Sequence, residues 1–420
     1  MPMAQDIART IEAVWRIEAA RVTAALARML RDVGLAEDLA QDALVAALEN
    51  WPRSGVPDNP GAWLMATAKH RAVDRLRREQ LIVRKHEQLG HDPDRLEAAH
   101  PADATDMLDD DIGDDLLRLV FTACHPVLPI ESRVALTLRM LGGLTTAEIA
   151  RAFLVPEPTI AQRIVRAKRA LADAAVPFEV PRGTERDERL PAVLGVIYLI
   201  FNEGYAASTG TDWTRPQLCE DALRLGRVLA GLAPGEPEVL GLVALMEIQA
   251  SRLGARRGPD GEPVLLLEQD RSRWDRLLIR RGLGALERIE RIGRAPGPYA
   301  LQAAIAACHA RARRAEDTDW ARIVTLYDAL AQVAPSPVVD LNRAVALGMR
   351  SGPAAGLDAV DRLLGDPALK DYHLLPSVRG DLLGKLGRRE EARTEFERAA
   401  ALTRNERERA LLLRRAAAHS

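Results

Sequence analysis

The sequence predicts an all-α protein built from several domains. Ala, Leu, Arg and Glu are abundant and aromatic residues make up only 4% of the chain, a composition that favours helix. Apolar residues recur at helical spacing in most segments, and short stretches with Gly or Pro separate these segments. A chain of 420 residues is too long for one typical domain and predicts about two to four.

The composition also restricts the class of protein. Hydrophobic residues make up 47% and charged residues 28%, with a net charge of −2, which is typical of globular proteins. Met1–Arg9 leads into an amphipathic helix and does not resemble a signal peptide, and the longest apolar run, Val193–Phe201, is too short to span a membrane. Cys124, Cys219 and Cys308 stand apart, which fits a reducing compartment. We therefore expect a cytoplasmic protein with no membrane span, metal or cofactor.

The N-terminal part contains two helical blocks, of which the first is residues 36–48. Its apolar positions are Leu39, Ala43, Val45, Ala46 and Leu48. Asp38, Gln41 and Asp42 leave an acidic and amide surface, which suits a partner rich in arginine because charge-assisted hydrogen bonds are strong. The alternative interpretation is an ordinary solvated helix face.

The second block, residues 60–78, is a basic helix whose positive charge continues to residue 85. Its cationic side chains include Lys69, Arg71, Arg75, Arg77 and Arg78, with His70, Arg84 and Lys85. A local positive stripe on a chain that is nearly neutral indicates contact with phosphates. Trp51 and Trp63 flank the loop Pro52–Asn59 and could stack on an unpaired base, or they could simply pack in the core.

An acidic segment, Asp92–Asp115, follows the basic helix. It contains ten acidic residues opposed only by Arg95. Such a composition buries too little apolar surface to offset the entropy of ordering, so we expect this segment to be flexible.

A helix-turn-helix is predicted over residues 144–171. Thr145 or Thr146 can cap the first helix, with Glu148 completing a capping box, and Pro156 and Pro158 separate the two helices. The second helix has an apolar face of Ile160, Ile164, Ala167 and Leu171, and a polar face of Thr159, Gln162, Arg163, Arg166 and Arg169. This polar face suits the DNA major groove, although a helical hairpin with a solvated basic face would look similar.

Further helices are predicted in the C-terminal half. They are Leu190–Asn202, Pro216–Gly231, Pro237–Arg252, Glu268–Glu290, Pro298–Ala315, Trp320–Ala334, Val338–Met349, Ala354–Leu364, Leu375–Leu386 and Arg389–Leu402. Within the first of these, Val193–Phe201 is interpreted as buried helix because no partner strand is evident. Leu375–Leu402, with Phe396 and Ala399, has the pattern of a tetratricopeptide repeat, and Pro335–Leu364 has the pattern of a degenerate copy. Such repeats bind a peptide or a neighbouring domain.

The two N-terminal blocks and the helix-turn-helix, in this order, resemble the extracytoplasmic-function (ECF) group of bacterial sigma factors over residues 1–180. The resemblance implies that Asp38, Gln41 and Asp42 dock on core RNA polymerase. It implies −10 contacts by Asn59, Trp63, Lys69, Arg71, Arg75, Arg77 and Arg78, and a flipped base held by the loop 53–59. It implies −35 contacts by Thr159, Gln162, Arg163, Arg166 and Arg169. The acidic linker would follow the RNA exit path of the polymerase.

The rest of the chain resembles the ECF group that carries a long C-terminal tetratricopeptide-like extension. The stretches Tyr198–Tyr205 and Asp270–Asp275 carry this part of the resemblance. It implies that the extension controls sigma activity through an intramolecular contact with the sigma domains. The candidate contact residues are Asn202, Glu203, Tyr205, Asp270, Arg273 and Trp274. Alternatively, Asn202 and Glu203 cap a helix and Trp274 lies in the core.

The predicted organisation is therefore as follows: a sigma-2-like domain (1–90), an acidic linker (91–112), a sigma-4-like domain (113–176), a linker (177–188) and a regulatory helical domain (189–420). The expected function is promoter-specific transcription initiation with core RNA polymerase and promoter DNA as partners. The alternative is a stand-alone helix-turn-helix activator with a repeat-type sensor. No catalytic residues are expected, because no phosphate-binding loop, paired-carboxylate pattern or nucleophile elbow is found.

Overall fold

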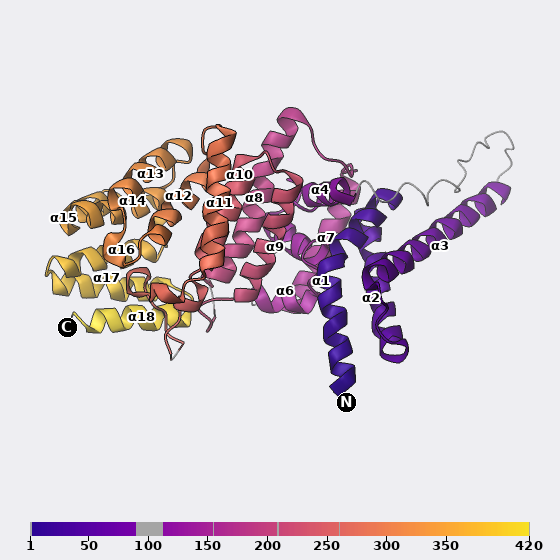
Figure 1. Ribbon diagram of the computed structural model, residues 1–420, viewed down its shortest axis with the longest axis horizontal. Helices are drawn as coiled ribbons and strands as arrows, with labels where there is room; N and C mark the ends of the chain where they lie inside the picture. The colour runs from indigo at the N-terminus through magenta and orange to yellow at the C-terminus, as the bar shows by residue number, and fades with distance from the viewer. Residues whose placement is uncertain (1, 90–111, 154, 208–209, 260, 420) are drawn as a thin grey trace. The chain divides into compact units, whose positions relative to one another are not determined.

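A computed structural model describes residues 2–89, 112–153, 155–207, 210–259 and 261–419. Over these residues the chain consists of helices and connecting segments, with two isolated β-bridges and no strand, which confirms the all-α prediction (Figure 1). It divides into two compact units, Met1–Val196 and Ile197–Ser420, which are described separately below.

The N-terminal unit begins with α1 (Pro2–Leu30), α2 (Val33–Ser54) and α3 (Pro60–Leu89), which pack against one another. The start of α2 is fixed by Asp32, whose Oδ1 accepts a hydrogen bond from Leu35 N at 2.9 Å. Its end is fixed by Gly55, whose φ of 84° favours glycine. Trp15 of α1 and Leu64 of α3 are among the buried residues that join these helices.

Four more helices follow in this unit: α4 (Ile112–Ala123), α5 (Ile130–Met140), α6 (Thr146–Phe153) and α7 (Glu157–Asp173). The predicted capping box is confirmed, because Thr145 N donates to Glu148 Oε2 at 2.7 Å and Glu148 N donates to Thr145 Oγ1 at 3.2 Å. The predicted apolar face of the second helix is buried. The helix-turn-helix α6–α7 therefore forms as the sequence indicates.

The acidic segment is only partly described. Residues 92–111 lie outside the described residues, whereas α4 starts at Ile112. Asp115 is buried on α4 and forms ion pairs with Arg118 at 2.6 Å and with Arg28 of α1 at 3.3 Å. The expectation of flexibility is therefore wrong for Asp115, because two arginines compensate for the burial of its charge.

The helices of the C-terminal half largely follow the predicted order. They are α8 (Gly183–Tyr205), α9 (Pro216–Leu232), α10 (Pro237–Ala250), α11 (Arg276–Ile292), α12 (Pro298–Arg311), α13 (Trp320–Val333), α14 (Pro337–Ser351), α15 (Pro353–Asp361), α16 (Leu374–Lys385), α17 (Arg389–Leu402) and α18 (Glu406–Ala417). Val193–Phe201 is helical, as predicted, and lies in α8, which starts inside the segment predicted as a linker.

One predicted helix is wrong. Residues 268–290 do not form a single helix, because Asp270 caps a short 3-10 turn (Arg271–Arg273) and Asp275 caps α11. Asp270 Oδ1 accepts from Ser272 N at 2.9 Å, and Asp275 Oδ1 accepts from Leu277 N at 2.8 Å. The two aspartates stabilise local turns in place of a continuous helix.

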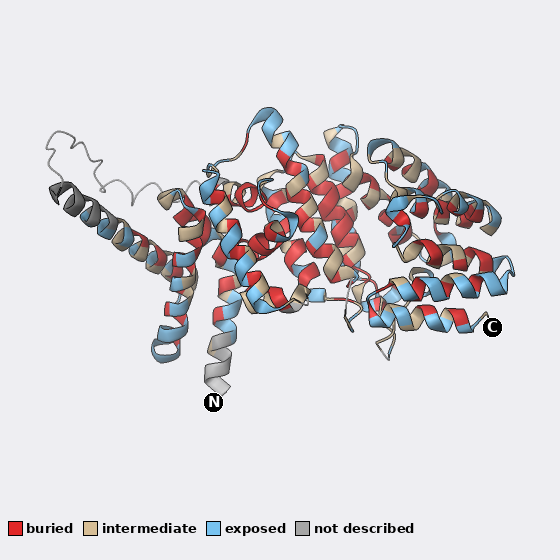
Figure 2. Cartoon of the chain, turned by 180° about the vertical axis from the view of Figure 1, so that it is seen from behind, coloured by how far each residue is buried: buried red, intermediate tan, exposed pale blue. Residues whose placement is uncertain are grey.

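Sequential packing of antiparallel helices organises the second unit. From α12 to α18 each helix contacts the next, and α10 contacts α9, α11 and α12. Buried residues cover most of α10 in the middle of this unit (Figure 2). The predicted repeat Leu375–Leu402 is the pair α16–α17, in which Gly380 leaves room for the buried ring of Phe396. This helical-repeat arrangement agrees with the tetratricopeptide-like pattern in the sequence.

Candidate polymerase and nucleic-acid interfaces

The exposed side of α2 combines acidic and aliphatic residues. Asp38 and Asp42 have 68% and 57% of their side-chain surface exposed, and Gln41 is half-buried. Val45 and Leu48, two of the apolar positions noted in the sequence, are 49% and 48% exposed. We call the exposed residues Asp38, Asp42, Val45, Leu48 and Glu49 the α2 face.

The α2 face follows from the phase of the helix. Leu39, Ala43 and Ala46 point to the core, and their spacing of four and three residues leaves Val45 and Leu48 outside that stripe. Sequence reasoning missed the two aliphatic residues because it counted apolar positions without fixing the helix phase. An exposed aliphatic pair bordered by carboxylates is typical of a protein-binding surface.

A buried carboxylate of α2 connects the α2 face to α7, the second helix of the helix-turn-helix. Glu37 is only 3% exposed and accepts a hydrogen bond from Arg139 Nε of α5 at 2.7 Å. Lys168 Nζ of α7 donates to Glu37 and also to Asp38 Oδ1 at 2.7 Å. Two cations thus offset the cost of burying Glu37. Asp38, predicted to dock on polymerase, is engaged with Lys168 in this structure.

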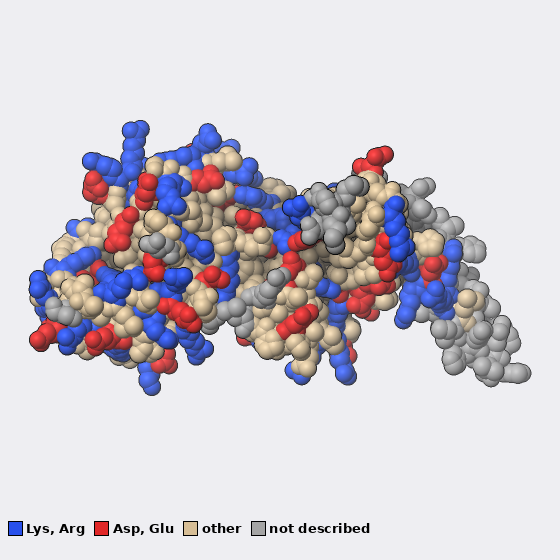
Figure 3. Space-filling model, turned by 90° about the horizontal axis from the view of Figure 1, so that it is seen from below, with Lys and Arg blue, Asp and Glu red and all other residues tan. Residues whose placement is uncertain are grey.

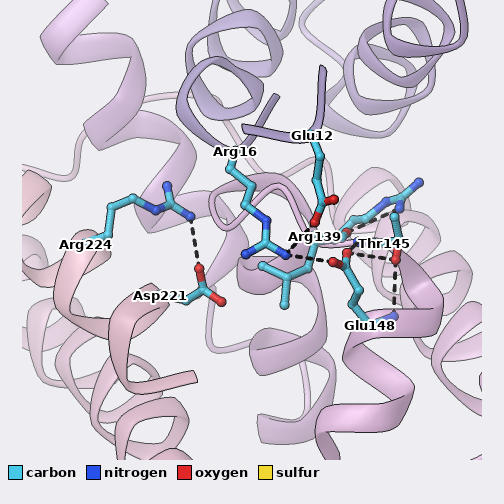
Figure 4. A network of polar contacts seen from close by, with 8 residues as sticks. Glu12, Arg16, Arg139, Thr145, Glu148, Asp221 and Arg224 are labelled. Atoms are coloured by element: carbon cyan, nitrogen blue, oxygen red, sulfur yellow. Dashed lines mark hydrogen bonds and ion pairs between the residues drawn. The ribbon is translucent and has the colours of Figure 1, made fainter. Parts of the chain in front are cut away.

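A second polar contact joins α1 to the helix-turn-helix (Figure 4). Arg16 donates to Glu148 Oε1 at 2.7 Å and to Glu12 Oε1 at 3.1 Å, and Glu148 also accepts from Thr145. Burial alone raises the pKa of Glu148, but the hydrogen bonds from Thr145 and the charge of Arg16 outweigh it and lower that pKa. The capping carboxylate therefore serves both the fold of α6 and the contact with α1.

The start of α3 positions two of the predicted −10 residues. Asn59 Oδ1 accepts a hydrogen bond from Ala62 N at 3.0 Å, so its side chain caps the helix. Trp51 is fully buried, and Trp63 packs edge-on against it with ring centres 5.4 Å apart. Trp63 is half-buried, so part of its surface remains accessible. Trp51 therefore packs in the core, which is one of the two interpretations given for both tryptophans.

The basic stripe lies further along α3. Arg75, Arg77 and Arg78 are exposed, whereas Lys69 and Arg71 are half-buried. Arg71 is 3.6 Å from Asp42 of the α2 face. Figure 3 shows a group of Lys and Arg side chains at the right of the view, in the region of α2 and α3. The basic stripe and the α2 face therefore adjoin, with Arg71 and Asp42 at their border.

The polar residues of α7 differ in their exposure. Gln162, Arg166 and Arg169 are exposed, while Thr159 and Arg163 are half-buried. Arg169 lies 3.5 Å from Asp173 of the same helix. Val165, which is 65% exposed, stands among these polar residues and was not singled out from the sequence.

The six regulatory candidates are engaged within the C-terminal half. Trp274 is only 3% exposed and packs under Arg252 and Arg271, so it belongs to the core, as one of its two interpretations proposed. Glu203 pairs with Arg215, and the Tyr205 ring stacks on Phe201. Asn202 bonds to Tyr198, Asp270 caps a turn, and Arg273 donates to the carbonyl of Gly254. For Trp274, the prediction of an exposed contact surface is therefore wrong.

Two further features bear on chemistry and on membranes. Among the described residues, no cluster of three or more His, Cys, Asp and Glu side chains could hold a metal ion. In the same part of the chain, no helix is both long and apolar enough to cross a membrane.

The thiol of Cys124 is not poised as a nucleophile. Cys124 is buried, and burial raises the pKa of its thiol to about 11 despite a contact with Thr137.

Comparison with known proteins agrees with this arrangement. Residues 15–82 match Sigma-70 region 2, residues 118–171 match Sigma-70, region 4, and residues 189–290 match a family of unknown function, DUF6596. Two domains of the sigma-70 type in this order define a transcription initiation factor and not an enzyme.

Individual relatives show to which group of sigma-70 factors the chain belongs. ECF RNA polymerase sigma factor SigK of Mycobacterium ulcerans (strain Agy99) is 34% identical over 157 residues, which cover 36% of this chain and 78% of SigK. SigK of Mycobacterium tuberculosis (strain ATCC 25618 / H37Rv) is 32% identical over 157 residues, which again cover 36% of this chain and 78% of SigK. The chain belongs to the ECF sigma factors. Over its whole length it is similar to the uncharacterized protein R00370 of Rhizobium meliloti (strain 1021), with 45% identity over 92% of this chain and 90% of that protein.

Proposed function

We propose that this sigma factor acts in the cytoplasm, where it docks on core RNA polymerase through the α2 face and directs it to promoters. The α3 stripe would contact the −10 element, and α7 would contact the −35 element. The observation that carries the proposal is that a single compact unit presents an acidic and aliphatic helix face, an adjoining basic stripe and a helix-turn-helix.

The chemistry of each surface supports its proposed partner. Asp38 and Asp42 suit arginine or lysine on the polymerase, and Val45 and Leu48 supply apolar area. Arg75, Arg77 and Arg78 would neutralise phosphates, and Trp63 would border an unpaired base. These assignments, and the −10 and −35 roles, are proposals for this chain.

Replacing Arg166 or Arg163 with alanine is expected to weaken promoter binding by the holoenzyme by about 1–3 kcal/mol if each arginine reads a base. Arg166 is exposed on α7, and Arg163 is half-buried on the same helix. Competition binding on a promoter library would show relaxed preference at one −35 position. Arg21→Ala, an exposed arginine of α1, is the control. An unaltered promoter profile in both α7 variants would refute their role in reading −35.

We also propose that the C-terminal unit, Ile197–Ser420, regulates the N-terminal unit. The long helical-repeat unit, which covers residues beyond the sigma-70 matches, supports this role. Coupling between domains is typically worth about 1–3 kcal/mol. Promoter-specific transcription by the full chain and by a chain ending at Val196 should therefore differ at least five-fold. Equal activity would contradict regulation and leave the sigma function intact.

A further inference from the structure

A cavity of about 890 Å³ lies within the C-terminal unit, a size suited to a small-molecule ligand. Its walls come from the segment that follows α8, the loop before α16 and the connection between α17 and α18. Buried Asn405 holds two of these walls together, because its side-chain nitrogen donates to Ala207 O at 3.1 Å and to Asp212 O at 2.8 Å. The cavity is therefore built by contacts between segments almost 200 residues apart.

An arginine flanked by aromatic rings lines this cavity. The Arg256 guanidinium carbon lies 3.9 Å from the ring centre of Tyr205 and 5.2 Å from that of Trp213. Arg256 is half-buried and lines the cavity, so its charge contributes directly to the potential inside it.

The other charged residues that line the cavity favour binding of an anion. Arg404 and Arg409 also line the cavity, opposed by Asp371 and Glu408. Glu408 is already engaged, because it lies 3.0 Å from His373 Nε2 and accepts from Thr403 Oγ1. The three arginines outnumber the two carboxylates of the lining by one charge.

We propose that this cavity binds a small organic anion with a flat aromatic body. Its negative group would lie at Arg256 and Arg404, and its ring would pack against Trp213, since both faces of Tyr205 are already covered by Phe201 and Arg256. The idea that such a ligand is the signal read by the C-terminal unit rests on the proposed regulatory function. The binding itself does not, so it is tested without polymerase or DNA.

The test uses the full chain and the fluorescent aromatic anion 8-anilinonaphthalene-1-sulfonate. Arg256→Gln is expected to raise the dissociation constant of this probe at least ten-fold. Arg404→Gln should raise it at least three-fold, and because Arg404 is exposed, this variant leaves the fold intact. Arg291→Gln, on the exposed side of α11, is the control and should bind like the wild type. Circular dichroism melting would verify that each variant is folded.

Competition experiments then distinguish the contribution of the ligand's negative charge to binding from that of its aromatic ring. The carboxylate 2-naphthoate should displace the probe at concentrations at least ten-fold lower than those needed for neutral 2-naphthalenemethanol or for inorganic phosphate. The proposal is overturned if both arginine variants bind the probe like the wild type. It is also overturned if the neutral alcohol or phosphate competes as well as the carboxylate.

Discussion

Glutamate in place of Val45 is expected to lower the affinity of this sigma factor for core RNA polymerase at least about 100-fold. Val45 is 49% exposed on the α2 face, next to Leu48 and between Asp42 and Glu49. Full burial of a valine side chain is worth about 1.5–3 kcal/mol, and a contact can bury only the exposed half of Val45, so losing it costs roughly half of that. Placing a carboxylate in the same contact adds a desolvation penalty, and 100-fold corresponds to about 2.7 kcal/mol.

Surface plasmon resonance with immobilised core polymerase measures this affinity. Ile17→Glu is a matched control, because Ile17 is also an exposed aliphatic residue, 64% accessible, but lies on α1. Both variants should melt like the wild type, since neither residue is buried. If Val45→Glu binds as tightly as Ile17→Glu and the wild type, polymerase does not dock on the α2 face.

Glutamine in place of Lys168 is expected to raise the affinity for core polymerase about ten-fold, the opposite of the first prediction. Lys168 of α7 bonds to Glu37 and Asp38, so it competes with polymerase for Asp38. When only a fraction of a protein is competent to bind, its apparent affinity falls by that fraction. Removing a charge-assisted bond of about 1.5–3 kcal/mol increases the competent fraction. Arg139 would still pair with Glu37.

The measurement is again the affinity for core polymerase, now without DNA, so that effects on promoter binding do not enter. Arg169→Gln is the matched control, because Arg169 neighbours Lys168 but pairs with Asp173 of its own helix. A gain for Lys168→Gln alone supports competition between α7 and polymerase. No gain, or an equal gain in both variants, contradicts it.

Local features of the fold could be read from the sequence. The Thr145–Glu148 capping box and the buried face of α7 depend on residues three or four positions apart, so their spacing predicted them. The α16–α17 repeat was predicted from Phe396 and Ala399, an aromatic and a small residue three positions apart on one helix. In each case the determining contacts lie within one motif.

Features that depend on distant contacts could not be predicted. Glu37 and Lys168 are 131 positions apart, and nothing in the local pattern of either indicates their ion pair. The exposure of Val45 depends on which side of α2 faces α1 and α3. Asp270 and Asp275 interrupt the helix predicted over 268–290, because capping of local turns competed with apolar periodicity. The sequence therefore indicated the surfaces of the site but not the contacts between them.

Reconstitution with core RNA polymerase tests the central claim most directly. The full chain is mixed with core enzyme and fragmented genomic DNA, and transcripts are mapped at their 5′ ends, in parallel with an Asp38→Arg/Asp42→Arg variant. Our account predicts transcripts with defined starts for the wild type, loss of polymerase capture for the variant, and no sequence-specific DNA binding by the chain alone. Specific binding to duplex DNA by the chain alone, without capture of core polymerase, would contradict it and favour a stand-alone activator.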